Sequence, residues 1–240
     1  MCNTIERAQQ FKSQASHARD GISVIFDIAG FSRFLNQPDV HSYIPKYLNL
    51  INKCVEVSLF GGIEPWRGKE GQDLSPLGVL PIHRKFLGDG ALYVWAPKES
   101  AVLTESFIIL LANRLWNVQK GFRQITGLCT EFIPVTELPT GIRFGVARGT
   151  IYELAFEKSG DREYVGVCIN LASRLQKYCA GLNFIASARL NMPSSILQKH
   201  NYMKVVATNI KGFPKEIVIV DRSEYAKLDP KVREDLFITL

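Results

Sequence analysis

The chain has 240 residues, of which 46% are hydrophobic and 22% are charged, so it can bury a full core and is not a disordered protein. Its net charge of +6 fits an anionic ligand, but no basic run with interleaved aromatics supports a nucleic-acid binder. A polar N-terminus and the lack of a long apolar run argue against a signal peptide and a membrane span. The five cysteines are odd in number and form no C-x-x-C pair, which indicates a reduced compartment, so we expect a cytoplasmic protein.

The first informative stretch is Ile22 to Asp27, a β-branched and aromatic run that predicts a buried strand ending on a carboxylate. Residues 29–32 then predict a tight turn, with Gly30 free to adopt a positive φ. We expect residues 1–20 to be a lead-in, 21–221 to be the main domain and 222–240 to be a C-terminal extension that is largely helical.

The remaining elements are predicted from hydrophobic spacing and from turn residues. In chain order they are a helix from Pro45 to Leu59 stopped at Gly61, a loop or hairpin arm over 64–76, a hairpin of 77–87 and 91–95, a long helix over 97–122, a loop over 127–139, a strand over 142–147, a hairpin of 149–157 and 162–165, a helix over 170–180, strands over 184–186 and 205–210 around a short helix near 191–199, a strand over 216–220, and a helix over 225–237 that Pro230 interrupts or restarts.

Two carboxylates occupy the same kind of position in this plan. Asp27 ends the first strand, and Asp89 lies in the Gly-Asp-Gly turn of the second hairpin. If the two strands are neighbours, the acids can hold two divalent ions together with substrate phosphates, and N–H groups of the turn after Asp27 can bind an anion. The alternatives are a solvated acid at a strand end and an ordinary hairpin tip.

Asn170 and Arg174 are four residues apart on a predicted helix and therefore point the same way. An amide and a guanidinium side by side can orient a sugar and hold a phosphate. The alternative for the pair is an exposed polar helix face.

Five segments taken in order carry a family resemblance: F-D-I-A-G-F-S, R-K-F-L-G-D-G-A-L-Y-V-W, I-R-F-G-V-A-R-G-T-I-Y, E-Y-V-G-V-C-I-N-L-A-S-R-L and N-I-K-G-F-P. From about Ile22 to Val220 the chain resembles the catalytic domain of class III adenylate and guanylate cyclases. This resemblance implies an α+β fold with a ferredoxin-like βαββαβ core and a mixed, mainly antiparallel sheet covered by helices. It also implies conversion of a nucleoside triphosphate into a 3′,5′-cyclic monophosphate and pyrophosphate.

The resemblance assigns Asp27, Asp89 and the carbonyl of Ile28 to two divalent metal ions, Mn²⁺ or Mg²⁺. It assigns the polyphosphate to backbone N–H groups and one lysine: Gly30, Phe31, Ser32 and Lys211.

By the same resemblance Lys85 and Glu163 contact the base, Asn170 orients the ribose, and Arg174 binds the α-phosphate in the transition state. It further implies a head-to-tail homodimer with composite active sites, because the metal acids and the Asn/Arg pair of one site come from opposite subunits. One chain carries both sets.

The base positions depart from the family pattern. Adenylate cyclases typically pair Lys with Asp or Thr and guanylate cyclases pair Glu with Cys, whereas this chain has Lys85 with Glu163. A lone cyclase domain with an atypical pair resembles the pyrimidine cyclases of bacterial antiphage defence, which make cyclic UMP or cyclic CMP. Tyr47 on the following helix can add an aromatic wall to a small-base pocket or can simply pack in the core.

A lysine can donate to uracil O4, whereas cytosine and adenine present an amino group at the comparable edge. The sequence therefore favours UTP as substrate, and adenylate cyclase, cytidylate cyclase and a non-catalytic dimerisation domain remain as alternatives.

Overall fold

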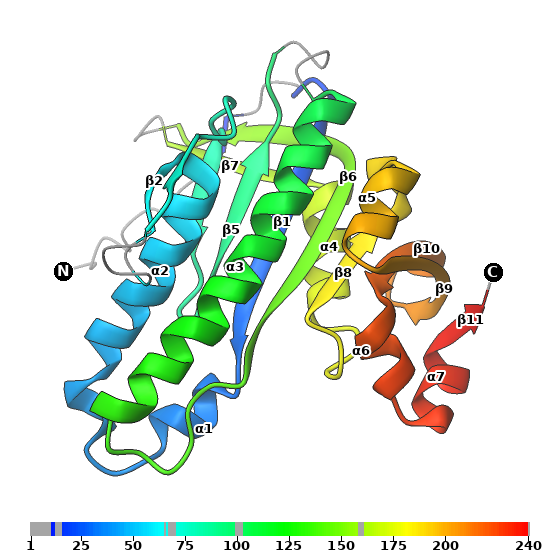
Figure 1. Ribbon diagram of the computed structural model, residues 1–240. Coiled ribbons are helices and arrows are strands. Elements are labelled where there is room, and N and C mark those ends of the chain that lie inside the picture. Colours follow the sequence, from blue (N-terminus) through cyan, green and yellow to red (C-terminus); the bar gives the residue numbers. More distant parts are fainter. Residues whose placement is uncertain are drawn as a thin grey trace, which may run out of the picture.

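The computed structural model describes residues 11–12, 16–64, 66, 71–98, 103–157 and 161–239. Figure 1 shows helices packed on the two faces of a twisted sheet. The helices are α1 (Phe31–Leu35), α2 (Ile44–Phe60), α3 (Glu105–Phe132), α4 (Val167–Gln176), α5 (Ser194–Lys199), α6 (Arg222–Lys227) and α7 (Pro230–Leu236). The strands are β1 (Arg19–Ala29), β2 (Gly62–Ile63), β3 (Asp73–Leu74), β4 (His83–Phe86), β5 (Gly90–Trp95), β6 (Gly141–Ala155), β7 (Arg162–Gly166), β8 (Phe184–Ser187), β9 (Tyr202–Ile210), β10 (Phe213–Asp221) and β11 (Phe237–Thr239).

The main sheet has the order β11-β9-β10-β8-β6-β1-β5-β4, with β7 paired to β6. Strand β1 is central and runs antiparallel to both β5 and β6, whereas β8 runs parallel to β6. The part β6-β1-β5-β4, connected through α2 and α3, is the ferredoxin-like βαββαβ core. The predicted fold class is confirmed. Residues 22–27 pair with residues 90–95, so the two acid-bearing strands are neighbours, as a shared metal site requires.

The two faces of the sheet bury two separate cores. Because successive side chains of a strand point to opposite faces, Val24 and Phe26 pack under α2 and α3, whereas Ile25 packs under α4. Helix α2 begins with a proline in its first turn and ends before Gly61, whose φ is 88°, as predicted.

The long helix was predicted wrongly at both ends. Helix α3 begins after Thr104, whose side chain accepts a hydrogen bond from the N–H of Phe107, and it continues through Gly127 to Phe132. A mid-helix glycine costs only about 1 kcal/mol relative to alanine, and burial of Ile125 and Cys129 on the inner face of α3 offsets that cost.

Strand β6 was predicted as two strands but is continuous across Gly149, because this residue pairs with Gly21 of β1. Of the turn predicted at Ser159-Gly160-Asp161, the first two residues lie outside the described residues, and Asp161 comes directly before β7. In the C-terminal region the restart at Pro230 is confirmed, since α6 ends at Lys227 and α7 begins at Pro230, and β11 then joins the main sheet beside β9. In the described part of the chain, no helix is both long and apolar enough to cross a membrane.

Candidate active site

The two predicted metal acids lie together at one end of the β1–β5 pair. Asp27 is opposite Gly90 in the register, so Asp89 comes one residue before the point where the two strands meet. A Cβ atom at Gly90 would lie 1.9 Å from the carbonyl oxygen of Phe26, which only glycine avoids. The Gly-Asp-Gly sequence therefore allows the turn that carries Asp89 to approach β1 closely.

Asp27 is held by an arginine that the sequence reasoning missed. Arg143 lies directly opposite Asp27 in the β1–β6 register. Its Nε donates to Oδ1 of Asp27 at 2.8 Å, and its Nη2 donates to Oδ2 at 2.6 Å. The signal was present in the I-R-F-G-V-A segment, because an arginine inside an apolar strand needs a partner on a neighbouring strand.

Asp89 is less favourably placed for ionisation. Partial burial raises the pKa of its carboxyl group above the ordinary value, and the negative charge of Asp27 raises it further. A backbone hydrogen bond and the positive charges of Arg143 and Lys177 act in the opposite direction on this pKa. The site thus contains two carboxylates that repel each other and a guanidinium that binds Asp27 and also acts on the charge of Asp89.

The turn after Asp27 has the predicted left-handed glycine, with φ of 83° at Gly30, and then enters the short helix α1. The N–H groups of Phe31 and Ser32 belong to the first turn of this helix, where no intrahelical acceptor is available. They follow Asp27 closely in the chain, and N–H groups without an intrahelical acceptor can bind an anion.

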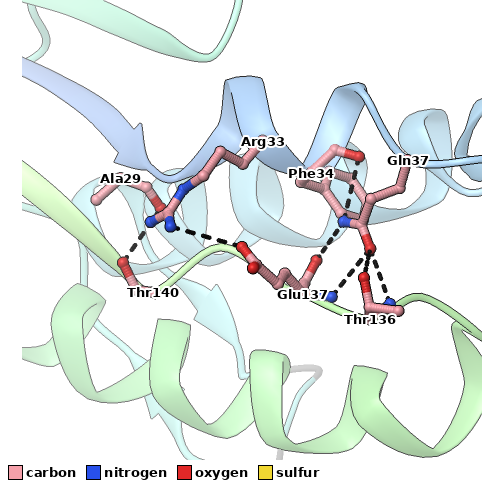
Figure 2. A network of polar contacts seen from close by, with 7 residues as sticks. All are labelled: Ala29, Arg33, Phe34, Gln37, Thr136, Glu137 and Thr140. Atoms are coloured by element: carbon pink, nitrogen blue, oxygen red, sulfur yellow. Dashed lines mark hydrogen bonds and ion pairs between the residues drawn. The ribbon is translucent and has the colours of Figure 1, made fainter.

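A second segment of the chain, residues 134–140, holds this turn from the side (Figure 2). The N–H of Thr140 donates to the carbonyl of Ala29 at 2.9 Å. At the far end of α1, the carboxamide oxygen of Gln37 accepts from the N–H groups of Thr136 and Glu137 at 2.8 and 2.9 Å. Its Nε2 donates to the carbonyl of Glu137 at 2.6 Å. Gln37 was also missed, since only the tertiary structure brings it beside residues a hundred positions away.

The predicted base-contacting pair is in contact within one chain. The Nζ of Lys85 on β4 donates to Oε1 of Glu163 on β7 at 2.7 Å. His83, two residues earlier on β4, lies with its Nε2 3.7 Å from Oε2 of Glu163. Burial lowers the pKa of His83, which favours the neutral imidazole. Because side chains alternate along a strand, His83 and Lys85 lie on the same face of β4. The sequence pattern could therefore have indicated that His83 lies close to the predicted base-contacting pair.

Asn170 and Arg174 lie on α4 and are both exposed. Neither side chain has a hydrogen bond or an ion pair within the part of the chain that the structure describes. Lys211 is exposed in the turn between β9 and β10, next to Gly212 with a φ of 82°. One chain therefore presents three separate features: the two acids with Arg143, the Lys85–Glu163 ion pair, and the exposed Asn170 and Arg174 on α4.

Tyr47 is fully buried, at 0% exposure, and its hydroxyl lies 3.5 Å from that of Thr126 on α3. Burial raises its pKa well above the ordinary value. This packing matches the alternative of a core side chain. The role of Tyr47 as a wall of the base pocket gains no support.

The donor set fits divalent ions that also bind substrate phosphates. No group of three or more His, Cys, Asp or Glu residues gathers within the described ranges, so the chain offers no complete metal cage there. Mg²⁺ and related ions are commonly held by one or two carboxylates together with phosphate oxygens. Asp27 and Asp89, with the Ile28 carbonyl beside them, are a set of this kind.

Solved structures with a similar fold include adenylyl and guanylyl cyclases. The adenylyl cyclase CyaB from P. aeruginosa superposes with a TM-score of 0.60 at 17% identity, over 86% of this chain and 96% of that one. The guanylyl cyclase Cya2 gives 0.56 at 18% identity, over 87% and 93%. The guanylate cyclase domain of RhGC from Catenaria anguillulae, in complex with GTP, gives 0.51 at 17% identity, over 85% and 97%.

The chain has the cyclase-domain fold. At these identities the likeness establishes the fold alone. No protein-family model and no curated protein sequence matches the chain.

Proposed function

We propose that the protein is a nucleotidyl cyclase that converts a nucleoside triphosphate into a 3′,5′-cyclic monophosphate and pyrophosphate. The observation that carries this proposal is the convergence of Asp27 and Asp89 beside a turn with open N–H groups, on a fold shared with adenylyl and guanylyl cyclases. A purely structural domain has no use for two repelling carboxylates at one strand end.

In this reaction the ribose 3′-oxygen forms a bond to the α-phosphorus, and the bond from that phosphorus to the bridging oxygen of the β-phosphate breaks. The 3′-hydroxyl proton is lost, and pyrophosphate leaves. Asp27, Asp89 and the carbonyl of Ile28 would hold two divalent ions, which when bound would supply positive charge that lowers the pKa of the 3′-hydroxyl and neutralises the polyphosphate.

The protein groups position the reactants. The N–H groups at Gly30, Phe31 and Ser32 bind the β- and γ-phosphates, with Lys211 as a further contact. Asn170 orients the ribose. Arg174 stabilises the charge that develops on the α-phosphate, a contribution that counts because it is larger in the transition state than in the ground state.

The free pair on α4 supports a composite site. Asn170 and Arg174 have no partner among the described residues of their own chain, and an unpaired, exposed Asn/Arg pair is available to a second subunit. A head-to-tail homodimer with C2 symmetry would bring the pair of one subunit to the acids of the other and create two equivalent sites.

UTP is the substrate that we propose, with ATP as the second candidate. The 2.7 Å contact between Lys85 and Glu163 supports a narrow base pocket, because the two long side chains close on each other. A lysine in that pocket donates to uracil O4. ATP is favoured by the adenine-type Lys85, beside which Glu163 can take the place of the usual Asp. A role of cyclic UMP as a signal in antiphage defence is part of the same proposal and follows from the resemblance to pyrimidine cyclases.

The test is incubation of the purified protein with ATP, GTP, CTP and UTP, each with Mn²⁺ or Mg²⁺, and chromatographic separation of the products. We expect cyclic UMP and pyrophosphate as the main products and none from Asp27→Ala or Asp89→Ala protein that remains folded. Faster cyclisation of ATP than of UTP at equal concentration would refute the base assignment alone. No cyclic product from any of the four would refute the activity.

A further inference from the structure

An apolar cavity of about 320 Å³ opens between the first half of α2 and the last turns of α3. Its wall includes Tyr47, Trp66 and Cys129, which are buried. Its rim includes Leu128 and Phe132 of α3, which are 47% and 72% exposed. Clefts that bind small molecules have volumes of about 300–1,000 Å³ and mostly apolar walls with a few polar groups, so this cavity is of the right size and kind.

The charge at the mouth of the cavity is positive. Lys46 is the one charged residue among the described residues that line it. Lys46 is exposed, and within the described ranges its ammonium group has no hydrogen bond or ion pair. An apolar wall with a free cation at its edge is complementary to a molecule with an apolar body and a carboxylate.

Three aromatic rings connect the cavity to the turn that follows Asp27. The ring of Tyr47 is 5.2 Å from the ring of Phe34 on α1, and Phe34 is 5.9 Å from Phe31 in the first turn of that helix. The wall also includes Ile133, the residue directly before the segment 134–140 that Gln37 holds. A molecule in the cavity would therefore contact Tyr47, which packs on Phe34 of α1, and Ile133, which leads into the segment that holds the end of α1.

We propose that this cavity is an effector site for a small amphipathic carboxylate, which places its apolar body between α2 and α3 and its carboxylate at Lys46. By filling space beside Tyr47, the bound molecule stabilises the packing of α1 and thereby strengthens metal binding at Asp27 and Asp89. The binding step stands on the cavity alone, whereas its effect on metal binding rests on the proposed function.

Binding is tested by calorimetry of the full chain with decanoate, using decanol and decylamine as uncharged and cationic probes. We expect saturable binding of decanoate, at least tenfold weaker binding of decanol, and no binding of decylamine. Shortening the chain to octanoate should weaken binding about fourfold per methylene lost, from the transfer free energy of a methylene.

Two charge reversals on α2 form a matched pair. Lys46→Glu should weaken decanoate binding at least tenfold, whereas Lys53→Glu, at an exposed position of the same helix that does not line the cavity, should leave it unchanged. Cys129→Phe fills the cavity from inside and should abolish binding. If that variant does not fold, Leu128→Trp at the exposed rim makes the same test. Equal binding by the two charge variants, or no saturable binding of decanoate to the wild type, would overturn the site.

The effect on the turn is tested through Mn²⁺ affinity, which requires no catalysis. Saturating decanoate should tighten Mn²⁺ binding about three- to tenfold, and Mn²⁺ should tighten decanoate binding by the same factor, because the coupling is reciprocal. Decanoate binding that leaves the Mn²⁺ affinity unchanged would refute the effector role. A protein that binds decanoate but cyclises no nucleotide would refute the proposed function and leave the site intact.

Discussion

The pairing of Arg143 with Asp27 leads to a quantitative prediction. Arg143→Met keeps the aliphatic bulk but removes both hydrogen bonds, and it leaves a carboxylate whose side chain is only 18% exposed. Breaking a fully buried ion pair by removing one partner costs about 3–5 kcal/mol. Because the arginine side chain keeps 23% exposure, we expect less, about 1.5–3 kcal/mol, the range for hydrogen bonds to charged groups. At about 2–4 °C per kcal/mol for a chain of this size, the melting temperature should fall by about 3–12 °C.

The assay is urea or thermal unfolding of the wild type, Arg143→Met, Asp27→Asn and the double variant, without metal and with saturating Mn²⁺. Without metal, the cycle should give a coupling free energy of about 1.5–3 kcal/mol. With Mn²⁺, the cost of Arg143→Met should shrink, because the ion replaces the positive charge beside Asp27.

A matched control lies on the same two strands. Arg148 forms a comparable pair with Asp20, at 2.9 Å from Nε to Oδ2, with side chains 24% and 31% exposed. Arg148→Met should also destabilise the protein, but Mn²⁺ should not change its cost. The reasoning is refuted if Arg143→Met costs as much in the Asp27→Asn background as in the wild type, or if Mn²⁺ relieves both arginine variants equally.

Three further predictions concern the same site. Gln37→Ala should weaken Mn²⁺ binding about tenfold in calorimetry, because it removes the hydrogen bonds that hold the end of α1 to residues 134–140. Asn36→Ala should have no effect. Equal Mn²⁺ affinities of the two variants would count against a role of the Gln37 hydrogen bonds in metal binding. Burial raises the pKa of Asp89, so ionisation of this carboxyl group lowers the folding stability as the pH rises through that pKa. Asp89→Asn should therefore be more stable than the wild type at pH 7 without metal, and the difference should vanish at acidic pH below the ordinary value of 3.8. A difference in urea midpoints that does not change with pH would contradict this. Arg174→Ala should lower kcat about 10²–10³-fold, the scale for one preorganised donor, and mixing it with inactive Asp27→Ala protein should restore part of the activity; no recovery from subunits shown to have exchanged would exclude a shared site.

The sequence by itself determined the features that depend on local patterns. The strand Ile22–Asp27 was predictable from its β-branched and aromatic run, the end of α2 from Gly61, and the break before α7 from Pro230. Asp27 near the end of β1 and Asp89 in the turn before β5 were recognisable because an apolar strand has no structural need for a carboxylate near its end. The cyclase-domain fold was indicated by the five sequence segments that resemble class III cyclase domains.

Only the tertiary structure decided which side chains meet. Arg143 reaches Asp27 because the β1–β6 register places them opposite each other, and a shift of one residue would turn Arg143 to the other face. Gln37 finds Thr136 and Glu137, and Lys85 finds Glu163, across separations of 78 to 100 residues that no local pattern encodes. Long-range packing also extended α3 past Gly127, kept β6 continuous at Gly149 and buried Tyr47, because burial against a partner outweighs the weak local preferences of single residues.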